Sequence, residues 1–144
     1  MKVIGVACGG YTSEREISLK SGDFMFNLIR DSDFECYKID INKNNYFVID
    51  KSGNKFSLNK KNFQFLINEV YISFDYIINL VHGSPGEDGK LTKKFEDLGI
   101  SHSTCSSSTA KLTFNKKKCL EFAKKNGIKT ARSKLIKKGQ DISE

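Results

Sequence analysis

Two short apolar segments, each running directly into a glycine-rich loop, constrain the fold of this chain most strongly. The segment "KVIGVAC" at 2–8 precedes Gly9-Gly10, and the segment "DYIINLVH" at 75–82 precedes "GSPGEDG" at 83–89. Apolar segments of this length that are rich in β-branched residues are typical of strands buried inside a parallel sheet. Because helical patterns follow both loops, we expect an α/β fold with a mostly parallel sheet flanked by helices.

The helix after the first loop is predicted to begin near Ser13, whose side chain would cap it. Glu14 and Glu16 would then lie in the first turn, where the helix dipole favours anions. Its buried face is expected to carry the apolar residues Ile17, Phe24, Met25, Leu28 and Ile29, which repeat with helical spacing.

The remaining elements follow from the same patterns. We expect a hairpin that turns at 52–54 and decorates an edge of the sheet. The full set comprises strands at 34–41, 100–103 and 131–138, the hairpin at 46–58, and helices at 61–70, 91–98 and from about 108 to 127.

The net charge of +7 does not by itself indicate nucleic-acid binding. Only three of the 24 basic residues are arginines, and the lysine runs lie apart without the interleaved aromatic residues that stacking on bases requires. We therefore do not expect nucleic acid as a partner. Steeply salt-dependent retention on DNA or RNA would support that alternative.

Four scattered cysteines without a CxxC pair give no support to a zinc site, and reduced thiols are the expectation. No apolar segment approaches the length of a membrane span, and the N-terminus has no signal-peptide cleavage pattern. We expect a cytoplasmic protein with no membrane association.

Both glycine loops follow the carboxyl ends of strands, which is where ligands bind in open α/β sheets. We expect the two loops to face one crevice. The first loop lacks the GxGxxG pattern and neither loop has GxxxxGK[ST], so nucleotide binding by this part of the chain alone is not predicted.

Three polar side chains at these loops allow more than one role. Glu14 could pair with a ligand's ammonium group or simply be a first-turn acid, and from position alone the second interpretation is favoured. His82 could contact a bound carboxylate or be a structural histidine. A metal site formed by His82, Glu87 and Asp88 is only weakly indicated, and Asp88 is expected to start the next helix.

The loop sequences "GGYTSEREISLKSG" at 9–22 and "LVHGSPGEDG" at 80–89 resemble the two N-terminal signatures of D-alanine–D-alanine ligases, at a compatible separation. The likeness continues through "KLTKKFEDLGISHS" and "SSSTAKLTFNKKKCLEFAKKNGIKT". It covers nearly the whole chain. The resemblance implies a Rossmann-like N-terminal domain at 1–127, of the kind that precedes an ATP-grasp domain, and the beginning of the central ATP-grasp domain at 128–144.

The resemblance also implies an activity and a set of site residues. The family joins two D-alanines for peptidoglycan, using ATP and magnesium, through a D-alanyl phosphate intermediate. By position, Glu14 matches the glutamate that holds the first D-alanine's ammonium group, His82 and Gly83 lie beside the same substrate, and Ile17 lines the methyl pocket. Lys116 matches a lysine that contacts an ATP phosphate. No residue of this chain is expected to bind the metal.

Two positions depart from the family pattern. Ser103-Thr104-Cys105 replaces a Thr-Gly or Ser-Gly turn after the short strand, and Asn115 replaces an aspartate before Lys116. Both lie on the side where ATP is expected. Neither change involves Glu14 or His82.

The family continues for about as long again, with domains that carry most of the ATP site, the magnesium-binding acids and the arginine for the acyl phosphate. We therefore expect the N-terminal part of a ligase that is inactive by itself and forms a homodimer as the full enzyme. The alternative is a noncatalytic ligand-binding or dimerisation module derived from a ligase. The choice of second substrate lies outside this chain.

Overall fold

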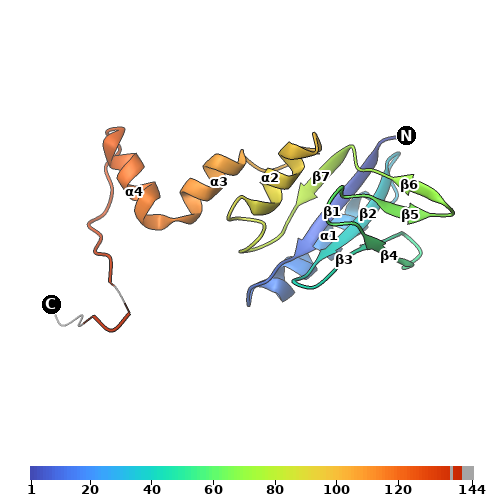
Figure 1. Ribbon diagram of the computed structural model, residues 1–144, viewed down its shortest axis with the longest axis horizontal. Helices are drawn as coiled ribbons and strands as arrows, with labels where there is room; N and C mark the ends of the chain where they lie inside the picture. The colour runs from blue at the N-terminus through green and yellow to red at the C-terminus, as the bar shows by residue number, and fades with distance from the viewer. Residues whose placement is uncertain (137, 141–144) are drawn as a thin grey trace. The chain divides into compact units, whose positions relative to one another are not determined.

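The computed structural model describes residues 1–136 and 138–140 (Figure 1). The chain divides into two compact units, Met1–Lys111 and Leu112–Glu144. The domain boundary predicted at residue 127 stays a prediction. The predicted start of a second domain at 128–144 falls partly on residues 137 and 141–144, which lie outside the described residues.

A six-stranded sheet organises the first unit, with strands in the order β4-β3-β2-β1-β7-β8 (Figure 1). Strands β1 (Val3–Gly9), β2 (Glu35–Ile41), β7 (Tyr76–Asn79) and β8 (Ser101–His102) run parallel. The antiparallel hairpin of β3 (Tyr46–Ile49) and β4 (Lys55–Leu58) continues one side. The predicted α/β class, its mostly parallel sheet and the edge hairpin are confirmed.

The core consists of two separate clusters of buried side chains. Helix α1 (Arg15–Ile29) packs against β1 and β2, where Phe26 meets Val6 and Cys36 in the smaller cluster.

The larger cluster contains several aromatic rings in edge-to-face contact, among them Phe63 with Phe95 at 5.2 Å between ring centroids and Tyr37 with Phe65 at 4.8 Å. Edge-to-face pairs of this kind stabilise a core beyond the area that they bury. Helix α2 (Lys90–Asp97) contributes Leu91 and Phe95 to it.

The helix predicted at 61–70 is wrong. Strands β5 (Phe65–Ile67) and β6 (Val70–Ile72) form a separate antiparallel pair there, and Figure 1 shows them as a hairpin. The two residues between the strands, Asn68 and Glu69, have φ angles of 47° and 66°. Left-handed backbone at both central positions is what a two-residue hairpin turn requires, and it ends any right-handed helix.

The buried face predicted for α1 is also largely wrong. Ile17, Phe24 and Leu28 are 59%, 71% and 67% exposed, whereas the buried positions of the helix are Ser18, Gly22 and Phe26.

The close approach of α1 to β1 explains this difference. A Cβ at Gly22 would lie 2.5 Å from the Cys8 sulfur, so the helix backbone comes too close to β1 for larger side chains. Ser13 does not cap the helix either, because Glu14 occupies the N-cap position without a side-chain hydrogen bond.

The predicted helix from 108 to 127 is divided into α3 (Ser107–Phe114) and α4 (Lys116–Lys125). Asn115 separates them with extended backbone, and its side chain accepts a hydrogen bond from the backbone N–H of Lys118 at 3.1 Å. Asparagine is a favoured N-cap residue, which accounts for the interruption. The strand predicted at 131–138 is wrong, since residues 131–136 and 138 belong to no strand in the described part of that segment.

Candidate functional site

The two glycine loops lie side by side, as the sequence predicted. Their strands, β1 and β7, are parallel neighbours, so both loops leave the same edge of the sheet. The backbone N–H of Tyr11 in the first loop donates a 2.9 Å hydrogen bond to the carbonyl of Ser84 in the second. The two segments that resemble the ligase signatures therefore form one structural feature.

Glycine at positions 10 and 83 makes this close approach of the loops possible. Both residues have positive φ angles, 111° and 64°. A Cβ at Gly10 would lie 2.8 Å from the carbonyl oxygen of His82, and one at Gly83 would lie 2.7 Å from the side chain of Thr12. Any larger residue would be strained by its backbone and would also push the loops apart.

Glu14 and Ile17 lie at the start of α1, next to the first loop. The Glu14 carboxylate is exposed and accepts no hydrogen bond from another side chain or backbone group among the described residues. Ile17, one turn further along, is 59% exposed. An accessible anion beside an apolar side chain on a rigid helix start can hold an ammonium group that carries a small alkyl substituent.

The second loop is held closed by its own polar groups. Gly83 and Glu87 bond reciprocally: the Gly83 N–H donates to the Glu87 carboxylate at 3.0 Å, and the Glu87 N–H donates to the Gly83 carbonyl at 2.7 Å. His82, which begins this loop, is half-buried. The Glu87 side chain is thus engaged in shaping the loop around Gly83.

Asp88 connects this loop to α2. Its carboxylate accepts hydrogen bonds from the Ser84 hydroxyl and the Lys90 backbone N–H, at 2.7 and 3.1 Å, and pairs with the Lys90 amine. Burial alone would raise the pKa of Asp88, but the bonds from Lys90 and Ser84 outweigh it and hold the pKa below its usual value. Asp88 therefore acts at the helix start as expected, although Gly89 occupies the N-cap position.

The weakly indicated metal site gains no geometric support. Among the described residues, no group of three or more His, Cys, Asp or Glu side chains lies close enough to hold an ion. Cys8, below the first loop, is fully buried, and burial raises the pKa of its thiol to about 12. It is a packed neutral thiol rather than a nucleophile.

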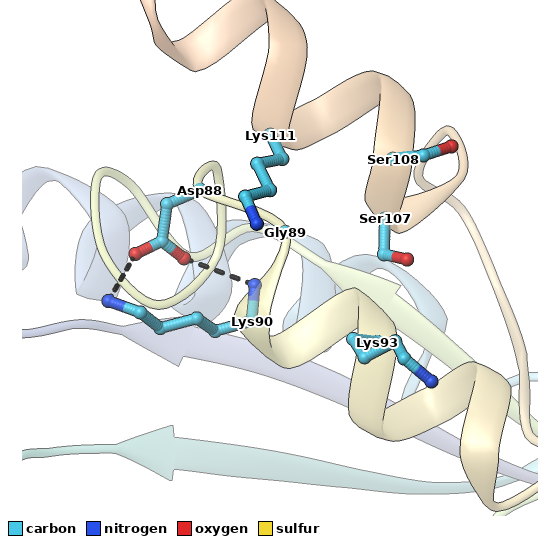
Figure 2. A pocket seen from close by; sticks show the side chains of 7 residues that line it. All are labelled: Asp88, Gly89, Lys90, Lys93, Ser107, Ser108 and Lys111. Carbon is cyan, nitrogen blue, oxygen red and sulfur yellow. Dashed lines mark hydrogen bonds and ion pairs between the residues drawn. The ribbon is translucent and has the colours of Figure 1, made fainter.

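Sequence reasoning missed a cavity of about 530 Å³ beside the second loop (Figure 2). Figure 2 shows Lys111 of α3 extending toward Gly89, and Asp88 bonded twice to Lys90. Three of the residues that line the cavity are lysines, but Lys90 and Lys93 form ion pairs with Asp88 and Asp97. Within the part of the chain that the structure describes, Lys111 is the lining lysine whose amine has no ion-pair partner. Three lysines spread over 90–111 gave no motif that could have predicted this cavity.

Lys116 belongs to the second unit and is exposed at the first position of α4. It lines another cavity, of about 310 Å³, together with residues of the following segment such as Lys134 and Leu135. Glu14 and His82 belong to the first unit.

The residues that depart from the family pattern have local partners. The Ser103 hydroxyl accepts a hydrogen bond from the Asn79 N–H at 3.0 Å, and the Thr104 hydroxyl bonds to His102 Nδ1 at 2.9 Å and to Thr92 at 3.2 Å. Cys105 is exposed. These contacts fix the segment after β8 without a glycine. None of the helices in the described residues has the length and apolar character needed to cross a bilayer.

Comparison with known proteins agrees with the two signature loops. The family model described as "D-ala D-ala ligase N-terminus" matches residues 3–105. The D-alanine–D-alanine ligase of Flavobacterium johnsoniae is 36% identical over 143 residues, covering 99% of this chain and 44% of the relative. This chain therefore spans less than half the length of the relative that it matches.

Solved structures show the same fold. The D-alanine–D-alanine ligase of Aeromonas hydrophila has a TM-score of 0.80 at 22% identity, over 99% of this chain and 53% of that one. The Bacillus anthracis ligase, whose structure is a complex with ATP, has a TM-score of 0.61 at 23% identity, over 90% of this chain and 39% of that one.

Proposed function

Because this chain belongs to the D-alanine–D-alanine ligase family, we propose that it forms the part of such a ligase that holds the first D-alanine. The observation that carries this proposal is the joining of the two signature loops by the Tyr11–Ser84 hydrogen bond and by the close approaches at Gly10 and Gly83. The loops place Glu14 and His82 at one edge of the sheet. The reaction would take place in the cytoplasm and supply D-alanyl-D-alanine for peptidoglycan.

The proposed reaction has two steps. The carboxylate of the first D-alanine attacks the γ-phosphorus of ATP, which gives D-alanyl phosphate and ADP. The amine of the second D-alanine then attacks the acyl carbon, loses a proton, and phosphate leaves as the peptide bond forms. ATP and magnesium would be held mainly by residues outside this chain, with Lys116 as a positively charged contact to an ATP phosphate.

Each site residue has a distinct part in this proposal. Glu14 would pair with the ammonium group of the first D-alanine, Ile17 would contact its methyl group, and His82 and Gly83 would lie along its carboxyl side. The Glu14 carboxylate is open to a ligand, and its helix start is more rigid than a free loop. Three different contacts on three substituents would also distinguish D-alanine from its mirror image.

Peptide-bond synthesis is proposed to need more of the ligase than residues 1–144. The chain covers 44% of the Flavobacterium johnsoniae ligase, and no group of metal-binding side chains occurs among the residues that the structure describes. We expect D-alanine binding from this chain and no dipeptide formation by it alone.

One surface feature favours a dimerisation role, both for the full enzyme and for the alternative of a noncatalytic module. Phe24 and Leu28 are 71% and 67% exposed on the same face of α1. Contiguous exposed apolar surface marks sites of protein–protein interaction, and Phe24 and Leu28 are neighbours one turn apart on α1. We propose that a second copy of the chain covers them, which would leave Ile17, at the loop end of the helix, for the substrate.

Replacement of Glu14 by Gln tests the proposed substrate contact. Loss of a charge-assisted hydrogen bond should cost about 1.5 to 3 kcal/mol, which corresponds to a Kd for D-alanine raised by roughly 10- to 150-fold in an NMR titration. Glu16→Gln is the matched control, because Glu16 is also an exposed acid and lies two residues further along, in the first turn of α1. Equal affinity of wild type and Glu14→Gln would refute the assignment of Glu14.

A further inference from the structure

One buried hydroxyl joins the roots of both loops. Ser18 is completely buried, and its Oγ accepts a hydrogen bond from the Gly9 N–H at 2.8 Å and donates one to the Leu80 carbonyl at 2.6 Å. Gly9 is the last residue of β1, and Leu80 follows the last residue of β7. A single side-chain atom therefore bridges the points at which the two loops leave the sheet.

The same residue is also tied to Glu14. The backbone N–H of Ser18 donates to the carbonyl of Glu14 at 3.1 Å, in the first turn of α1. Ser18 thus connects three elements: the helix start that carries Glu14, the strand end before Gly10, and the strand end before His82. Gly10 and Gly83, where the two loops approach each other closely, lie one and three residues after Gly9 and Leu80, the residues that bond to the Ser18 hydroxyl.

The site suits serine better than other small residues. One hydroxyl satisfies a buried donor and a buried acceptor at once, and alanine would leave both without a partner. Threonine would add a methyl group where no part of the side chain is exposed. Cysteine would replace two short bonds by weaker and longer ones to sulfur.

We propose that Ser18 is a positioning residue of the D-alanine site: it sets the separation between the loop that leads to Glu14 and the loop that begins at His82. It acts through these two loops and does not touch the substrate. This inference rests on the proposed function. It adds that a residue with no contact to the substrate determines how the substrate contacts are spaced.

The test compares Ser18→Ala with Thr92→Val in the full 144-residue chain. Thr92 is also completely buried, and its hydroxyl bonds to Thr104 without bridging the loops. Each variant is titrated with D-alanine by 15N–1H NMR, its stability is measured by urea unfolding, and hydrogen exchange is followed at the Tyr11 N–H, which spans the loops. A purely structural role would lower stability in both variants and leave D-alanine affinity unchanged.

We expect Ser18→Ala to raise the Kd for D-alanine by about tenfold or more and to speed exchange at the Tyr11 N–H, because a misplaced contact loses most of its strength. Thr92→Val should keep the Kd within about twofold of wild type, the range expected for a site that is not coupled to the ligand. If Ser18→Ala does not fold, Ser18→Cys should show a smaller loss of affinity.

Wild-type affinity in a folded Ser18→Ala or Ser18→Cys variant would overturn the inference. Unchanged exchange at the Tyr11 N–H would overturn it too, and this readout needs no ligand. Absence of D-alanine binding by the wild-type chain would instead refute the proposed function, so the two failures can be told apart.

Discussion

Gly83 occupies a position that no other residue fits without cost. Its φ is 64°, and a Cβ there would meet the Thr12 side chain at 2.7 Å. Gly53, in the turn between β3 and β4, has a similar φ of 85° but nothing within 4 Å of an added Cβ. Comparing alanine substitutions at Gly53 and Gly83 therefore separates two costs. Both substitutions strain the left-handed backbone, and only the one at Gly83 also pushes the two loops apart.

We expect Gly83→Ala to lower the free energy of unfolding by about 2 to 3 kcal/mol and Gly53→Ala by about 1 kcal/mol, because both are strained and Gly83→Ala also collides with the first loop. Urea unfolding of the two variants measures the difference. Equal losses would show that the loops can separate freely at Gly83.

Individual residues differ in how far the sequence could predict them. The resemblance to the ligase signatures predicts Glu14, Ile17, His82 and Gly83 as site residues. Glu14 and Ile17 lie at the start of α1, directly after the first loop, and His82 and Gly83 lie on the second loop, which contacts the first. The sequence does not single out Ser18, because a serine in an amphipathic helix is usually a solvent-facing residue. Only the packing of α1 against β1 reveals that it is buried.

Helix α1 shows why its buried face could not be predicted from hydrophobicity. Its backbone approaches β1 so closely at Gly22 that only small residues fit, and they were counted as polar or neutral. The larger apolar side chains were therefore assigned to the wrong face. The β5–β6 hairpin was missed for a related reason: its turn uses Asn68 and Glu69, without the glycine that usually marks such a turn.

A substitution in the β5–β6 turn tests whether Asn68 and Glu69 form a left-handed turn without glycine. Glu69 has a φ of 66°, which costs a residue with a side chain about 1 to 2 kcal/mol relative to glycine. We expect Glu69→Gly to raise the free energy of unfolding by about 0.5 to 1 kcal/mol, although glycine gains entropy in the unfolded chain. Glu87→Gly, at an exposed residue whose carboxylate bonds to Gly83, should instead destabilise the fold. A destabilised Glu69→Gly would contradict the assigned turn.

The alternation of strands and helices in the sequence predicts the α/β class and the mostly parallel sheet of the first unit, but not the order of its strands. The prediction that both glycine loops lie at the same edge of the sheet is confirmed, because β1 and β7 are parallel neighbours. The segment after residue 127 was predicted less well. Its apolar spacing suggested a strand, but a strand needs a neighbour to pair with, and residues 131–136 have no partner strand in the described part of the chain.

Association of two copies is a prediction for the whole molecule. We expect the chain to form dimers through Phe24 and Leu28 and Phe24→Glu to make it monomeric, since a charge on an apolar interface is costly to bury. Tyr71→Glu is the matched control, because Tyr71 on β6 is 70% exposed, close to the 71% of Phe24, and receives the same charge. Sedimentation equilibrium measures the result, and identical behaviour of the two variants would argue against the α1 face.

The most direct test of the account is a titration of the chain with D-alanine and with L-alanine, followed by 15N–1H NMR. If Glu14, Ile17 and His82 hold three different substituents of one amino acid, D-alanine should shift the amides of Gly10 and Gly83 saturably, and L-alanine should bind about tenfold or more weakly. Equal responses to the two enantiomers, or shifts confined to residues outside both loops, would contradict the proposal that this chain holds the first D-alanine.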